Sequence, residues 1–174
     1  MSETVVEPER ITTVVESGET EAVNDLIDEL EGLAVDDQLA TFEAVYEMLL
    51  DCMDCADGYS RQAVVRVVSA LDPATGRMVA ETAPDQFETI PDEQRFADAI
   101  ERAATLFVAA LTDADGRVRR AAIRGINSLC TGCRLTGDQA TIEQLVEDIE
   151  ALSPDDESEE HVAEARETAL SQLH

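Results

Sequence analysis

One stretch of the chain, residues 106–129, predicts two helices joined by a tight turn; it reads LFVAALTDADGRVRRAAIRGINSL. On both sides of the turn, apolar residues recur at helical spacing, which places them on one face of each helix. They are Leu106, Phe107, Ala110 and Leu111 before the turn and Val118, Ala121, Ala122, Ile126 and Leu129 after it. Between them, Gly116 tolerates a positive φ, and a carboxylate of Asp113 or Asp115 can cap the second helix. The stretch therefore predicts a helical hairpin with a short loop.

The same turn occurs a second time, which identifies an internal repeat. Two sets of residues stand at equal offsets before Leu71 and Leu129: Asp57-Gly58, Arg61 and Arg66 in the first, and Asp115-Gly116, Arg119 and Arg124 in the second. The β-branched residues between Val64 and Val68 would suit a strand as well as a helix. The repeat favours a helix, so we expect both segments to be second helices of helical pairs.

The rest of the chain continues this pattern with one interruption. Helices are expected over residues 8–17, 20–31, 36–55, 58–71, 92–111, 116–129, 138–152 and a last segment holding Val162 to Leu173. Residues 72–91 carry Pro73, Gly76, Pro84 and Pro91, and we expect an irregular insertion there, with at most a turn or two of helix around 76–83. The prediction is an all-α fold of about four helical pairs in a single domain over residues 1–174.

The opening hairpin resembles a HEAT repeat, because its second helix follows an Asp-rich turn, begins with Val118-Arg119 and buries Ala121-Ala122. The resemblance implies a right-handed α-solenoid, in which hairpins stack side by side and the second helices line a concave surface. It also implies that arginines at the positions of Arg61 and Arg119 brace the turns, here against Asp113 or Asp115.

The charge is extreme: 39 acidic and 12 basic residues give a net charge of −27, and every basic residue is an arginine. This composition resembles that of proteins from salt-accumulating halophilic archaea. In molar salt the Debye length is only about 3 Å, so the self-repulsion is largely screened. An anionic surface opposes binding to nucleic-acid phosphates and to anionic lipids. We therefore expect neither nucleic acid nor a membrane as a partner.

No segment predicts export or insertion into a membrane. Residues 1–9 are acidic and lack the apolar core of a signal peptide. No apolar run approaches the roughly 18 residues that a membrane-spanning helix needs. A cytoplasmic location is expected.

The four cysteines form two CxxC pairs, Cys52 with Cys55 and Cys130 with Cys133. Four thiolates can complete a tetrahedral zinc site. In a regular hairpin stack, however, the first pair ends a first helix and the second pair ends a second helix. The pairs should then lie at opposite edges, roughly 20 Å apart. We expect small buried thiols, and a shared zinc site or redox-active pairs remain the alternative.

Arginine is unevenly distributed and indicates a binding face. Arg117, Arg120 and Arg124, with Asn127 one turn later, fall on one side of the second helix of the hairpin, and Arg66 repeats the position of Arg124. Such a basic ridge within an acidic surface could hold a carboxylate-bearing partner through bidentate contacts. With carboxylates this abundant, the ordinary alternative is that these arginines pair with Asp and Glu of neighbouring helices.

Catalytic chemistry is not indicated. The chain has two histidines, and it contains no phosphate-binding loop, nucleophile elbow or glycine-rich dinucleotide turn. We expect a non-enzymatic protein-binding adaptor or scaffold factor that needs no cofactor and whose partner is another protein. The alternative is a zinc-binding or redox-linked regulatory protein that uses Cys52, Cys55, Cys130 and Cys133.

Overall fold

The computed structural model describes residues 6–55 and 57–173, and within them every regular element is a helix. The description therefore covers most, but not all, of the single domain expected over residues 1–174. The helices are α1 Pro8–Ser17, α2 Thr20–Glu31, α3 Val35–Cys52, α4 Gly58–Ala70, α5 Pro73–Thr82, α6 Glu93–Ala110, α7 Gly116–Leu135, α8 Gln139–Glu150 and α9 Glu159–Leu170, with a short 3₁₀ helix η1 at Pro84–Gln86. The predicted all-α fold is confirmed.

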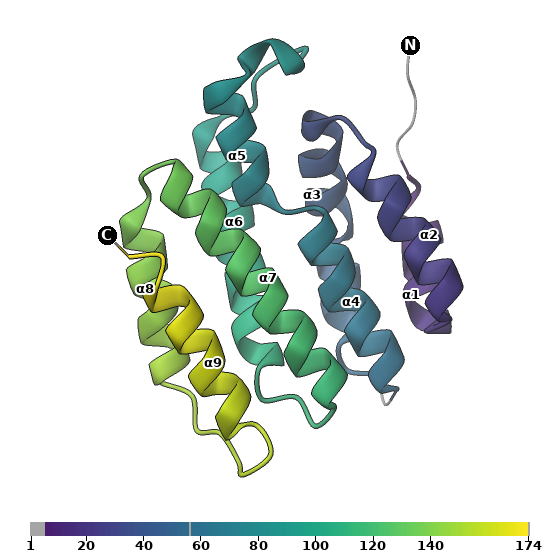
Figure 1. Ribbon diagram of the computed structural model, residues 1–174. Helices are drawn as coiled ribbons and strands as arrows, with labels where there is room; N and C mark the ends of the chain where they lie inside the picture. The colour runs from purple at the N-terminus through teal and green to yellow at the C-terminus, as the bar shows by residue number, and fades with distance from the viewer. Residues whose placement is uncertain (1–5, 56, 174) are drawn as a thin grey trace.

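The helices pack in two rows (Figure 1). One row runs through α1, α3, α6 and α8, and the other runs through α2, α4, α7 and α9; each helix contacts its neighbours in its own row. Successive helices pair across the rows, α1 with α2, α3 with α4, α6 with α7 and α8 with α9. The right-handed solenoid implied by the resemblance stays a prediction.

The prediction of an irregular insertion over residues 72–91 is wrong for the first half of that segment, where α5 forms a regular helix. Asp72 accepts hydrogen bonds from the backbone N–H groups of Ala74 and Thr75, and Pro73 stands at the first helical position, where its missing N–H costs nothing. Helix α5 packs against α3, α6 and α7 and buries Ala74, Gly76 and Arg77. Only residues 83–92 keep the irregular conformation, with η1 inside them.

Aspartate side chains cap the N-termini of most of the later helices. Asp57, Asp72, Asp92, Asp115 and Asp138 each accept a hydrogen bond from a backbone N–H of the first turn. Such caps satisfy donors that have no partner inside the helix. Within the described residues a positive φ occurs only at Gly18 and Gly137. The left-handed conformation considered for Gly116 is therefore not used, and the cap of Asp115 suffices to begin α7.

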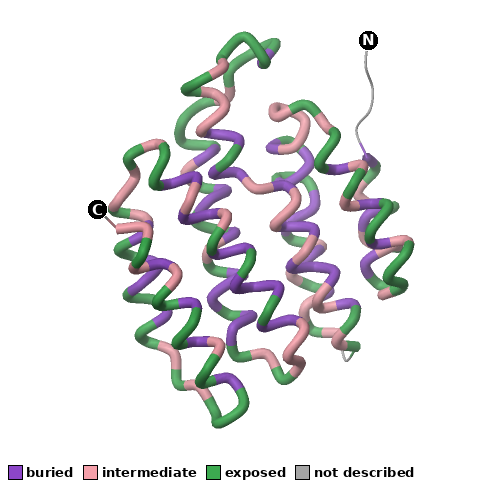
Figure 2. Tube along the Cα trace, viewed as in Figure 1, coloured by how far each residue is buried: buried purple, intermediate pink, exposed green. Residues whose placement is uncertain are grey.

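The core is a single continuous cluster of buried side chains that runs from Val6 to Ala169 (Figure 2). It consists mainly of Ala, Val, Leu and Ile, with Phe42, Phe96 and Phe107 as the largest fully buried side chains. Helix α7 lies very close to its neighbours. A Cβ at Gly125 would meet the Phe107 ring at 2.6 Å, and one at Gly132 would meet the Ala74 backbone at 2.8 Å. All helical pairs therefore share one core, and α7 is its central member.

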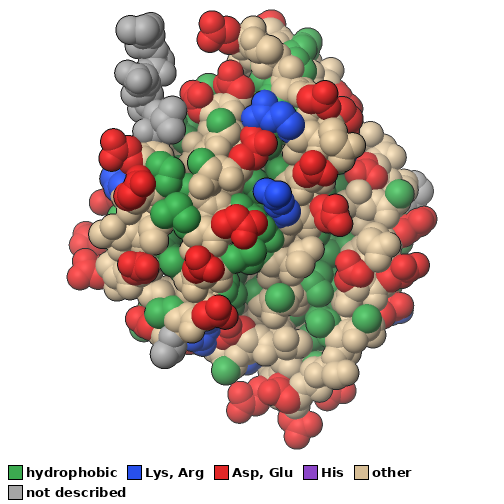
Figure 3. Space-filling model, turned by 180° about the vertical axis from the view of Figure 1, so that it is seen from behind, with side chains coloured by type: hydrophobic (Ala, Val, Ile, Leu, Met, Phe, Trp, Pro, Cys, Tyr) green, Lys and Arg blue, Asp and Glu red, His purple; other side chains and the backbone are tan. Residues whose placement is uncertain are grey.

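Acidic side chains are scattered over the face formed by the first row of helices, with a few basic groups and hydrophobic side chains between them (Figure 3). This distribution differs from a block of like charges, which would favour a disordered tail. Among the residues that the structure describes, no helix combines the length and the apolar character needed to span a bilayer.

Candidate partner-binding site

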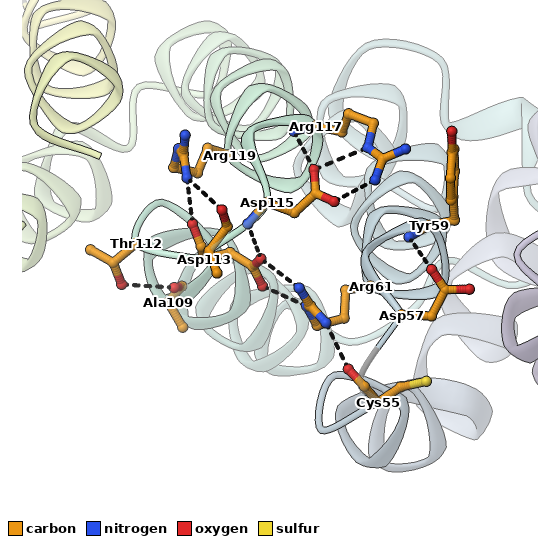
Figure 4. A network of polar contacts seen from close by, with 11 residues as sticks. Cys55, Asp57, Tyr59, Arg61, Ala109, Thr112, Asp113, Asp115, Arg117 and Arg119 are labelled. Atoms are coloured by element: carbon orange, nitrogen blue, oxygen red, sulfur yellow. Dashed lines mark hydrogen bonds and ion pairs between the residues drawn. The ribbon is translucent and has the colours of Figure 1, made fainter. Parts of the chain in front are cut away.

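The turn that opens α7 is tied to the preceding helical pair by Arg61 of α4 (Figure 4). Its Nε and Nη2 donate to the two carboxylate oxygens of Asp113, at 2.9 and 3.1 Å, and its Nη1 donates to the backbone oxygen of Cys55 at 2.8 Å. Both partners are mostly buried, with 15% and 10% of their side-chain surfaces exposed. The hydrogen bonds that Arg61 donates to Asp113 raise the pKa of Arg61. Arg61 therefore joins the turn before α4 to the turn before α7.

Arg119 occupies the equivalent position in α7 and braces its own turn. Nη1 donates to the backbone oxygens of Asp113 and Ala114, at 2.7 and 3.2 Å. Its Nε donates to Nδ1 of His161 in α9, at 3.2 Å. The expected bracing of the turn is present, although Arg119 uses backbone oxygens instead of a carboxylate. His161 thus contributes to contact between helical pairs.

Arg117, which the sequence places in the basic ridge, is engaged within the chain. Its Nε and backbone N–H both donate to Oδ1 of Asp115, at 3.0 and 2.8 Å, and its guanidinium lies 3.7 Å from the centre of the Tyr59 ring. The side-chain hydrogen bond from Arg117 lowers the pKa of Asp115 to about 2. The contact with Tyr59 is a cation–π interaction between α7 and α4. Arg117 therefore holds a junction between neighbouring helices.

Arg120 and Arg124 behave differently. Both are exposed on α7, and their guanidinium groups have no hydrogen-bond or ion-pair partner among the described residues. Asn127 is also exposed one turn further along α7. Pairing with carboxylates of neighbouring helices, the alternative for this ridge, is not found: Arg117 pairs with Asp115 at the start of its own helix, and Arg120 and Arg124 have no partner among the described residues. Figure 1 looks onto the row of helices that includes α7.

A groove lies beside these arginines, between α2, α4 and α7. Its volume is about 390 Å³, and it is lined by Ile27, Glu31, Gln62, Arg66, Ser69, Ala70, Ala121 and Arg124. Nη2 of Arg66 donates to Oδ1 of Asn24 at 2.7 Å, so its direct partner is neutral. The structure thus brings together Arg66 and Arg124, which occupy equivalent positions in the sequence repeat. Sequence reasoning missed Ile27 as a groove residue, because its periodicity assigned it to the core face.

A larger groove, of about 560 Å³, lies between α6 and α8 on the opposite row. It is lined by the carboxylates Glu101 and Asp148 and reached by Arg77. Arg77 is already ion-paired: Nη2 donates to Oδ2 of Asp138 at 2.9 Å, and Nη1 lies 3.5 Å from Oε1 of Glu93, although its buried Nε has no partner among the described residues. This groove therefore offers no unpaired cation, in contrast to the groove beside Arg124.

The two cysteine pairs lie in separate parts of the fold. Cys52 is the last residue of α3, next to the turn before α4. Cys130 and Cys133 lie near the C-terminal end of α7. Figure 1 shows these two helix ends at opposite edges of the molecule. Within the described residues, no group of three or more His, Cys, Asp or Glu side chains could hold a metal ion. A zinc site shared by Cys52, Cys55, Cys130 and Cys133 is therefore not assembled in this arrangement.

Cys130 and Cys133 are also poorly suited to redox chemistry. Both are buried, and burial raises the pKa of each thiol to about 12. The thiolate is the reactive form, so such thiols react slowly near neutral pH. Residues three apart in a helix have Cβ atoms about 5–6 Å apart, which exceeds the usual separation in a disulfide. The pair therefore fits the expected role of small buried side chains.

No family model and no curated protein matches this chain. Among solved structures, a crystal structure of an engineered protein from the Northeast Structural Genomics Consortium is similar over 94% of this chain and 97% of its own, at 14% sequence identity and a TM-score of 0.33. A similarity at this level carries no argument about function. The candidate site therefore depends on the geometry of α2, α4 and α7.

Proposed function

We propose that the chain is a non-enzymatic protein-binding adaptor or scaffold factor. Its binding face would be the row of helices α2, α4, α7 and α9, the second helices of the four pairs. The observation that carries this proposal is that Arg120 and Arg124 are exposed and unpaired within the described residues, in a chain with 39 acidic residues. Arginine is well suited to binding interfaces because its planar guanidinium makes bidentate contacts.

The surroundings of the ridge support the same proposal. Arg66 and Arg124 line a groove whose wall also includes Ile27 and Ala121. An apolar surface beside exposed arginines matches the composition of interface centres, where aliphatic groups are buried and arginine is enriched. A partner of nucleic acid or anionic lipid is disfavoured by the net charge of −27. We further propose a HEAT-like solenoid acting in the cytoplasm of a salt-accumulating cell, since salt would screen this charge.

The experiment is affinity capture from the native host in high salt. Arg120→Glu/Arg124→Glu should abolish capture of a co-purifying protein and leave the melting temperature unchanged, because both side chains are exposed and have no partner within the described residues. Arg95→Glu/Arg134→Glu changes the net charge equally and lies outside the groove lining, so capture should persist. Unchanged capture by the first variant would show that the ridge has no binding role.

A further inference from the structure

The arginines beside the groove lack the carboxylate partners that other arginines of the chain have. Within the described residues, those paired with a carboxylate are Arg10, Arg61, Arg77, Arg95, Arg117 and Arg166. Arg66 is bonded to the neutral side chain of Asn24, and Arg124 has no partner in the described part of the chain. Six of the twelve arginines lack a carboxylate partner within the described residues, and of these only Arg120 and Arg124 also have no hydrogen bond or aromatic contact there. The groove therefore offers unsatisfied positive charge and guanidinium donors.

The groove also offers a small apolar surface between those charges. Ile27 of α2, Ala70 of α4 and Ala121 of α7 contribute to its lining. The small alanine side chains leave room that a larger residue would fill. A volume of about 390 Å³ lies within the usual range of ligand sites. An occupant should therefore combine one apolar group with flanking negative charge.

We propose that the groove binds an acidic peptide segment of the partner protein. One apolar side chain of that segment enters between Ile27, Ala70 and Ala121, and its neighbouring carboxylates bind Arg66 and Arg124. Arg120 lies one turn before Arg124 on α7 and extends the same positive surface. This inference rests on the proposed protein-binding function and adds to it the chemistry of the segment recognised. Glu31 is the one carboxylate in the groove lining, and it opposes such a ligand.

The net charge gives this interaction an unusual dependence on salt. An acidic peptide approaching a protein of charge −27 is repelled at long range. Raising the salt from about 0.1 M to about 1 M shortens the Debye length from about 10 Å to about 3 Å, which removes most of that repulsion. Contacts between guanidinium and carboxylate at hydrogen-bond distance are screened much less. Binding should therefore strengthen as salt is added, opposite to ordinary ion-pair association.

The test uses the full chain and a short fluorescein-labelled peptide with one leucine between pairs of glutamates, followed by fluorescence anisotropy. The same peptide with glutamine at each glutamate, and a second with serine in place of leucine, are the matched ligands. The acidic peptide should bind about threefold tighter at about 1 M than at about 0.1 M KCl. Both matched peptides should bind about tenfold more weakly, because each lacks one kind of contact.

Variants of the protein locate the site. Arg66→Gln/Arg124→Gln should weaken binding of the acidic peptide about tenfold, and Glu31→Gln should strengthen it by removing a like charge. Arg10→Gln/Arg134→Gln loses the same charge outside the groove lining and should bind as the wild type does. Circular dichroism verifies that each variant is folded. Equal binding of the acidic and glutamine peptides, or no binding of either, would overturn the inference.

The outcomes separate the two proposals. If Arg120→Glu/Arg124→Glu abolishes capture of the native partner while the acidic peptide does not bind, the proposed binding face is supported and the proposal of an acidic peptide segment is wrong. If that variant leaves capture unchanged, the binding function proposed for this face fails whatever the peptide does.

Discussion

Arg61 and Asp113 are 52 residues apart in the chain and form a two-point ion pair, with both guanidinium–carboxylate contacts at 2.9 to 3.1 Å. The pair connects the start of α4 to the turn before α7, so it couples two helical pairs. Bidentate geometry and burial make it stronger than an exposed ion pair. It is the clearest single contact that packs one segment of the sequence repeat against the next.

The Arg61–Asp113 pair should contribute measurable coupling energy. Arg61→Met or Asp113→Ala should each lower the free energy of unfolding by about 2–3 kcal/mol, between the values for exposed and fully buried pairs. The double variant should lose less than the sum, by about 1–2 kcal/mol. Urea unfolding of all four proteins measures this. The exposed pair Arg10–Glu29 is the control cycle, for which about 0.5 kcal/mol is expected; equal coupling in both cycles would contradict the assignment.

Asp115 should make stability depend on pH in acid. Because Arg117 lowers its pKa in the folded state from 3.8 to about 2, the ionised carboxylate stabilises the fold above its unfolded pKa. That contribution should be lost as the pH falls from about 4 to about 2. Asp115→Asn should therefore reduce the fall in unfolding free energy over this range, measured by urea titrations at each pH. Asp25→Asn, at an exposed position, is the control; parallel curves for both variants would refute this role of Asp115.

Gly132 should resist replacement although it lies inside a helix. An alanine would normally favour the helix by about 1 kcal/mol. Here its Cβ would lie 2.8 Å from the Ala74 backbone, which cannot rotate away. Gly132→Ala should therefore lower the free energy of unfolding by about 1–3 kcal/mol as α5 and α7 are forced apart. Gly116→Ala, whose Cβ would meet only the ends of Arg119 and Arg120, is the comparison. A stabilised Gly132→Ala protein would mean that α5 is not packed this closely.

The cysteines should differ sharply in reactivity. Cys55 is partly exposed, whereas Cys130 and Cys133 are buried with pKa values raised to about 12. In the native protein near pH 8, a thiol reagent should label Cys55 first and react with Cys130 and Cys133 at least about 100-fold more slowly. Labelling followed by peptide mass spectrometry measures each site. Cys55→Ser should remove the fast phase, and all remaining cysteines should react in urea; fast native labelling of Cys133 would contradict its burial.

The sequence is a good guide to helix positions because the signals that start and end helices are local. Asp92 caps α6 and Asp115 caps α7 through hydrogen bonds that span two residues. Gly18 ends α1 with a positive φ. The same local reasoning failed at α5, because Pro73 and Gly76 were interpreted as helix breakers. Pro73 begins the helix, and a Cβ at Gly76 would lie only 3.2 Å from the Phe96 ring.

The candidate site was predicted less completely. Helical periodicity correctly placed Arg120, Arg124 and Asn127 on an exposed side of α7. It could not show that Arg117 is held by Asp115 and stacked on Tyr59, which depends on how α4 meets α7.

By itself, the sequence determined the all-helical architecture, most helix boundaries and the excess of negative charge. These properties follow from caps, periodicity and composition, which act over a few residues or over the whole chain. Only the tertiary structure decided that α5 is packed into the core and that Arg66 and Arg124 line one groove with Ile27. Those relationships join residues far apart in the chain, and they depend on how closely the side chains let the helices approach.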